Sequence, residues 1–154
     1  MTNLYDDDFY RWLQQQAQLL CERRFSELDL DNLVEEIQSL ARAEVRTIED
    51  AICSIIKYRL LKALMPEARQ RWCWDSRISE HQSTLLTWIE SSPSLKPRLL
   101  EMCKEEREYA ERQAADELQR LGYAGDEMLK QITVSARDVF GGWYIDGLEV
   151  LNEE

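Results

Sequence analysis

The stretch Leu28-Asp29-Leu30-Asp31-Asn32-Leu33 opens the longest uninterrupted helical pattern of the chain. Asp29 is suited to cap the free amides at a helix start, and Leu28 can staple onto the following turn. No glycine or proline follows until Pro66. The pattern therefore predicts one helix over about residues 29–64, roughly 50 Å long at 1.5 Å per residue. A helix of this length kinks, packs its two halves on different neighbours, or buries part of its stripe in a dimer.

Three further helical patterns flank the long one. Apolar residues recur at helical spacing in the segments 6–24, 70–90 and 95–121. Ser94 is expected to cap the last of these helices, with Pro97 in its first turn, where a missing amide costs nothing. The sequence thus predicts an all-α, up-and-down bundle of four main helices in a single domain spanning residues 1–154.

The last part of the chain differs in composition, because all five glycines lie at or after Gly122. Residues 126–139 suit a short helix that Asp126 caps and Gly141-Gly142 ends. The tail over residues 143–151 fits either an arm laid over the bundle or a short β-ribbon. Residues 122–154 are therefore expected to form a C-terminal appendage.

Charge is distributed unevenly along the chain. The 30 acidic and 19 basic residues give a net charge of −11, which argues against a surface that coats nucleic acid or an anionic membrane. Residues 51–100 are an exception, with 8 basic and 4 acidic groups. No long apolar run occurs, and the chain starts with polar residues rather than a leader. We expect a cytoplasmic protein that makes no membrane contact.

Several kinds of chemistry lack the residues they need. The four cysteines show no CxxC pairing and are expected to be reduced and structural; they are Cys21, Cys53, Cys73 and Cys103. His81 is the single histidine, which excludes a di-iron bundle and argues against nucleophile-base catalysis. No glycine-rich phosphate loop is present, because no glycine precedes residue 122. We predict no catalytic residue.

Two sequence stretches are distinctive: the first runs from Tyr5 to Trp12 and reads YDDDFYRW, and the second runs from Phe25 to Ile37 and reads FSELDLDNLVEEI. Both resemble a bacterial family that is abundant in cyanobacteria and catalogued as domain-of-unknown-function family number twenty-nine. Shorter matches at residues 92–95 and 109–112 extend the resemblance over about residues 4–121. The resemblance implies an all-helical bundle and brings no activity, catalytic residue or cofactor with it.

Acidic residues raise one enzymatic alternative. All-helical nucleotide pyrophosphatases hold Mg²⁺ with acidic side chains three and four residues apart on facing helices. Four residues here have about that spacing: Glu35, Glu36, Glu105 and Glu108. The same spacing is common on solvated helix faces, and the second helix lacks a further acid at position 39 or 40. A magnesium-dependent, nucleotide-processing enzyme is therefore a secondary hypothesis.

The basic segment 57–77 raises another alternative, because it interleaves cations with aromatic rings. Such a cluster can hold phosphates while indoles stack on bases. The candidate binding residues are Arg59, Lys62, Arg69, Arg71, Trp72 and Arg77. Nucleic-acid or phosphate binding competes with docking of a protein, including a second copy of the chain. The favoured hypothesis is a small acidic protein-interaction module that binds a protein partner and can form a homodimer.

Overall fold

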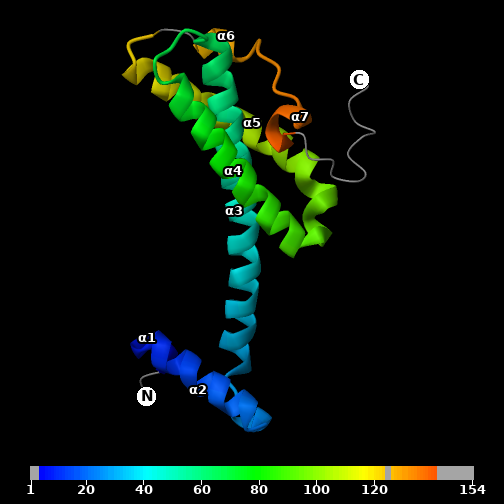
Figure 1. Ribbon diagram of the computed structural model, residues 1–154. Coiled ribbons are helices and arrows are strands. Elements are labelled where there is room, and N and C mark those ends of the chain that lie inside the picture. The colour runs from blue at the N-terminus through cyan, green and yellow to red at the C-terminus, as the bar shows by residue number, and fades with distance from the viewer. Residues whose placement is uncertain (1–3, 124–125, 142–154) are drawn as a thin grey trace. The chain divides into compact units, whose positions relative to one another are not determined.

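The computed structural model describes residues 4–123 and 126–141, and every regular element among them is helical (Figure 1). The seven α-helices are α1 (Leu4–Asp7), α2 (Phe9–Cys21), α3 (Leu30–Leu64), α4 (Arg71–Ser91), α5 (Leu99–Arg120), α6 (Asp126–Leu129) and α7 (Ala136–Phe140). Short 3-10 turns cover Phe25–Glu27 and Pro93–Arg98. The all-α fold with four main helices is confirmed, and α3 matches the predicted long helix to within one residue.

The chain divides into two compact units, Met1–Ala43 and Glu44–Glu154, which we call the N-terminal unit and the C-terminal unit. Helix α3 begins in the first unit and ends in the second. The expectation of a single domain stays a prediction. In the N-terminal unit, α2 packs through Trp12, Gln16 and Leu19, which lie one turn apart and are all buried.

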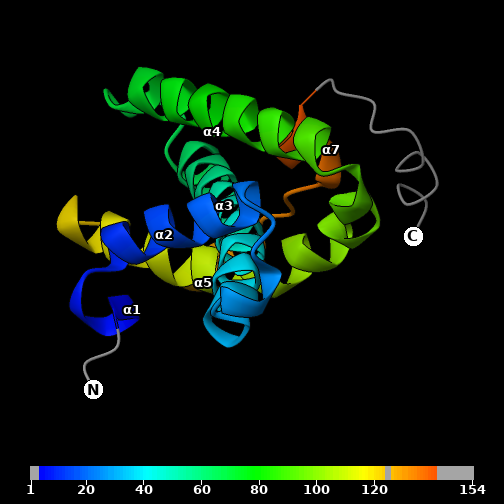
Figure 2. The same ribbon diagram turned by 90° about the horizontal axis from the view of Figure 1, so that it is seen from below.

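The C-terminal unit contains the main hydrophobic core. Ile48, Ile52 and Ile55 of α3 are fully buried against apolar residues of α4 and α5. Ala110 and Ala114 are also fully buried, and their small side chains let α5 approach its neighbours closely. Helix α7 lies beside α4 in both views and adds buried apolar side chains to this core (Figures 1 and 2).

The start of the fourth main helix differs from the prediction. Ser94 does not cap it, and Pro97 lies inside a 3-10 segment rather than in the first α-helical turn. The α-helix α5 begins at Leu99. The residue before it, Arg98, occupies the N-cap position and makes no side-chain capping hydrogen bond. The physical reason is that each proline disfavours α-helical geometry in the residue before it, so Pro93 and Pro97 together delay the helix.

The helix predicted over residues 126–139 is also wrong, because the chain forms two short helices there. Residues 130–135 lie between them and are not helical. Ser135 and Asp138 form a reciprocal capping box that starts the second helix, α7. Gly141, with φ +71°, ends α7 in a conformation that side chains disfavour.

Two further expectations concern the C-terminal tail and membrane contact. The predicted tail at residues 143–151 lies outside the described residues. Among the helices that the structure does describe, none has the length and apolar character to cross a bilayer.

Candidate functional site

Asp29 connects α2 to the start of α3 in the N-terminal unit. Its carboxylate accepts the indole N–H of Trp12 at 3.1 Å and the side-chain amide of Asn32 at 2.8 Å. Its own backbone N–H donates to Oε1 of the buried Gln16 at 2.9 Å. The bond from Asn32, together with that from Trp12, lowers the pKa of Asp29. The role of Asp29 at the start of α3 is confirmed, and the same residue also fixes α2.

The two metal candidates of this unit have other partners. The hydroxyl of Tyr5 donates to Glu36, and this bond raises the pKa of Tyr5 to about 12. Glu35 forms an exposed ion pair with Arg42 at 2.6 Å. The rings of Tyr5 and Trp12 also meet edge to face, with centroids 4.9 Å apart. These contacts join the two stretches that carry the family resemblance, so a structural role accounts for much of their pattern.

The other two metal candidates, Glu105 and Glu108, belong to the C-terminal unit. Glu108 lies 3.5 Å from Arg112 in an exposed pair. Glu105 is exposed and lies near Glu106, whose pKa is raised by burial and by neighbouring carboxylates. No group of three potential metal ligands occurs in the part of the chain that the structure describes. Magnesium binding by the four glutamates stays a prediction.

Exposed apolar side chains concentrate in the N-terminal unit. Of the 13 large hydrophobic residues exposed in the described structure, nine lie between residues 9 and 40. We call them the apolar face: Phe9, Tyr10, Leu13, Leu20, Phe25, Leu30, Val34, Ile37 and Leu40. Ile37 and Leu40 are 65% and 71% exposed, respectively. A concentration of this kind typically marks an interaction surface, whereas single exposed hydrophobic residues are ordinary.

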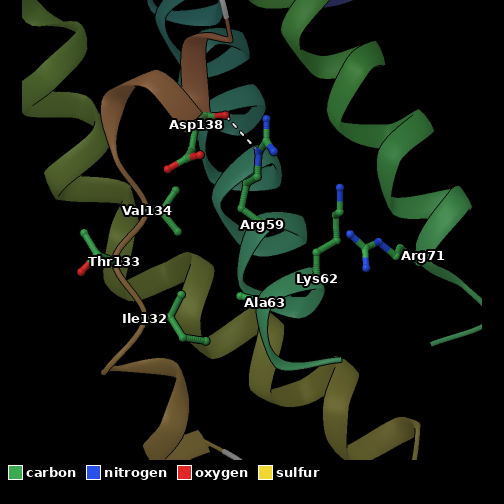
Figure 3. Close-up of a pocket in the computed structure, with 8 residues that line it drawn as sticks. All are labelled: Arg59, Lys62, Ala63, Arg71, Ile132, Thr133, Val134 and Asp138. Atoms are coloured by element: carbon green, nitrogen blue, oxygen red, sulfur yellow. Dashed lines mark hydrogen bonds between the residues drawn. The ribbon is translucent and has the colours of Figure 1, made fainter. Parts of the chain in front are cut away.

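Three of the predicted basic residues meet in a groove of the C-terminal unit (Figure 3). We call this cavity of about 310 Å³ the basic groove; it is lined by Arg59, Lys62, Ala63, Arg71, Ile132, Thr133, Val134 and Asp138. Arg59 and Lys62 lie one turn apart on α3, and Arg71 starts α4. The structure therefore brings together half of the residues proposed for phosphate binding.

The other three candidates, Arg69, Trp72 and Arg77, are exposed and do not line this groove. Trp72 is 75% exposed. Arg77 pairs with Glu80 at 3.2 Å on the surface of α4. The extended row of cations and rings that a nucleic acid would need is not gathered around the groove.

The cysteines and the histidine occupy ordinary structural positions. Cys53 and Cys103 are free thiols, and burial raises their pKa values to about 11 and 12. His81 is half-buried and stacks on Tyr58, with ring centroids 6.5 Å apart. Burial lowers the pKa of His81 and so favours its neutral imidazole. All four cysteines are free, as expected.

Sequence reasoning missed the second wall of the basic groove. The Nε of Arg59 donates to the backbone oxygen of Asp138 at 3.1 Å, and Arg107 donates to the backbone oxygen of Ile132 at 2.5 Å. These bonds hold residues 132–138 opposite α3. The Ser135-Ala136-Arg137-Asp138 capping box was a readable signal for α7, but nothing local indicated where that helix would dock.

The fold and these surfaces define a class: an all-α protein with an apolar face in one unit and a basic groove in the other. A family model described as "Domain of unknown function DUF29" matches residues 4–140. The chain belongs to this family, and the match extends beyond the predicted resemblance to include α6 and α7. No curated protein and no solved structure matched the chain in the searches.

Proposed function

We propose that this protein acts as a non-covalent interaction module whose apolar face binds a second copy of the chain. The observation that supports this proposal is the concentration of exposed apolar side chains between residues 9 and 40. Burying one isoleucine or leucine of this kind is worth about 1.5–3 kcal/mol, so several together are enough to stabilise a complex.

The spacing on α3 suits a helix partner. Leu30, Val34 and Ile37 follow one another at intervals of four and three residues, and all three are exposed. This alternation is the pattern with which two helices bury a common seam. Leu40 continues the stripe by a further turn.

Charge favours a second copy in antiparallel orientation. The helix around the stripe begins with the exposed acid Asp31 and reaches the exposed cation Arg42, which pairs with Glu35 of the same helix, three turns later. Antiparallel pairing would bring Asp31 of one copy alongside Arg42 of the other. The contact between two identical surfaces is also the commonest way in which proteins form closed dimers.

The test is sedimentation equilibrium of the full chain from low to high micromolar concentration. The proposal predicts a dimer, and Ile37→Asp should weaken it by about 100-fold or more, because each dimer loses two buried side chains and gains two charges. Gln15→Asp is the matched control: it adds the same charge at an exposed polar position of α2 and should leave the dimer intact.

A monomer at every concentration would contradict the proposal. So would a dimer that Ile37→Asp leaves unchanged while circular dichroism shows the variant to be folded. Loss of helicity in Ile37→Asp is not expected, because this side chain is mostly exposed; if it occurs, Leu40→Gln supplies a milder variant at a 71% exposed position.

A further inference from the structure

The basic groove of the C-terminal unit offers a second binding site that does not depend on the apolar face. Three cationic side chains from two helices line it, and among the described residues Asp138 alone contributes a carboxylate to the lining. That carboxylate is already engaged, since it accepts the backbone N–H and the hydroxyl of Ser135 at 2.9 and 2.7 Å. With Asp75, which pairs with Lys62, counted as well, the three cations exceed the carboxylates at the groove by one.

The cations keep donors available. Arg59 uses its Nε on the backbone oxygen of Asp138, and Arg71 uses one Nη on the backbone oxygen of Pro66 at 2.8 Å. A guanidinium has five N–H donors and an ammonium has three. Within the described residues, the remaining guanidinium nitrogens of both arginines have no acceptor.

The side chains of Lys62, on α3, and Arg71, at the start of α4, lie beside each other, and the Arg71 guanidinium points toward Lys62 (Figure 3). Lys62 is held by an ion pair with Asp75, and its side chain is only 17% exposed. Arg71 has no carboxylate partner among the described residues, and the first turn of α4 contains no acid. Two neighbouring cations with a single counter-ion leave a net positive charge that an anion would neutralise.

The opposite wall is apolar and fixed in place. Ile132 and Val134 line it, and the backbone of this segment is anchored by Arg107. The side-chain amide of Gln82 donates to the backbone oxygen of Val139 at 3.0 Å and holds α7. An anchored apolar wall that faces cations suits a ligand with one anionic end and one apolar or planar part.

We propose that the basic groove binds a small phosphate monoester, with the phosphate between Arg59, Lys62 and Arg71 and the remainder of the molecule against Ile132 and Val134. A phosphate monoester offers three acceptor oxygens and nearly two negative charges, which matches planar guanidinium donors and a lysine point charge. A volume of about 310 Å³ lies at the lower end of small-molecule sites and fits a mononucleotide-sized ligand better than a nucleic-acid strand.

The test is isothermal titration of the full chain with inorganic phosphate and, separately, with adenosine monophosphate. Both should bind saturably, the monoester more tightly because it also contacts the apolar wall. Arg71→Ala and Lys62→Ala should each weaken the binding of both by about tenfold or more, as expected for the loss of a charge-assisted hydrogen bond. Arg77→Ala, which removes an exposed cation of the same helix outside the groove, should change the affinity by less than twofold.

Val134→Ser separates the two parts of the site. It should weaken adenosine monophosphate and leave inorganic phosphate unchanged. Arg71 is exposed, so its alanine variant should fold, and its melting curve checks this.

Absence of saturable binding of either ligand would overturn the proposal, as would binding that Arg71→Ala and Lys62→Ala leave unaltered. A third arm uses a single-stranded oligonucleotide. Tight, salt-dependent binding of that probe that is lost in Arg69→Ala/Arg77→Ala and kept in Arg71→Ala would replace the small ligand with nucleic acid on the outer surface.

Discussion

Replacing Asp29 with alanine should loosen the N-terminal unit without unfolding the C-terminal unit. The substitution removes the carboxylate that caps α3, a loss worth about 1 kcal/mol. It also leaves the indole N–H of Trp12 without its acceptor at a side chain that is 2% exposed, which costs about 1 kcal/mol more. The backbone bond to Gln16 survives. The expected destabilisation is therefore about 2 kcal/mol.

Native-state hydrogen exchange measures this effect by segment. A loss of about 2 kcal/mol speeds exchange about 30-fold wherever the amides open with the N-terminal unit. The amides of α2 should show this change, and those of α5, which packs in the separate core, should not. Equal acceleration in both helices, or none in either, would refute the assignment of Asp29 as the connection between α2 and α3.

Asp29→Asn is the matched control, because it keeps the size and one acceptor oxygen while removing the charge. We expect it to cost about half as much as alanine and to change the pH dependence. The folded-state pKa of Asp29 is lowered, so its ionised form adds stability above the unfolded-state pKa, and this stability is lost as pH falls through the folded-state value. The opening free energy of the α2 amides, obtained by dividing each exchange rate by the intrinsic rate at that pH, should therefore fall below about pH 4 in the wild-type chain, and Asp29→Asn should remove that part of the fall.

Two further substitutions test the C-terminal unit, and one labelling reaction compares cysteines of both units. Ile52→Ala should lower the free energy of unfolding by about 2–5 kcal/mol in urea titrations, because Ile52 is fully buried and a cavity replaces it; a change below about 1 kcal/mol would contradict its place in the core. Glu106→Gln should raise the melting temperature at pH 7 and not at pH 4. The raised pKa of Glu106 means that its ionisation destabilises the fold. This penalty appears as pH rises from the unfolded-state pKa through the folded-state pKa, and it is absent below both values. In labelling with a thiol reagent at pH 8, the exposed Cys21 should react first, and Cys53 and Cys103, whose pKa values burial raises to about 11 and 12, should react much more slowly; faster labelling of Cys53 or Cys103 than of Cys21 would be incompatible with these environments.

The helical architecture follows from local signals that the sequence displays openly. Asp29 marks the start of α3, Pro66 follows its end, and the apolar spacing between them is regular, so helix length could be predicted to within one residue. Errors arose where two local signals compete. Ser94 is a good cap in isolation, but the prolines at 93 and 97 restrict the backbone around it and the α-helix begins only at Leu99.

The candidate sites were less predictable, because they depend on contacts between distant segments. The cations at positions 59, 62 and 71 were visible as a charged stretch, and their grouping follows from the packing of α3 beside α4. Asp138 and Val134 were invisible as groove residues, since Arg59 reaches residue 138 across 79 positions of sequence. The exposure of Ile37 and Leu40 was likewise unreadable, because an apolar stripe at helical spacing looks the same whether a neighbour covers it or not.

The two stretches that identify the family also constrain where a function can reside. Trp12 donates to Asp29 and Tyr5 donates to Glu36, and each internal bond uses a donor or acceptor that a ligand would otherwise contact. Selection of these residues is therefore explained by the fold of the N-terminal unit. On its outer surface this fold leaves Val34 and Ile37 of α3 exposed to solvent. Exposed apolar side chains lower the solubility of a monomer, and a partner that covers them would remove this cost. The residues that identify the family hold the N-terminal unit together, and the neighbouring exposed apolar residues would contact the partner.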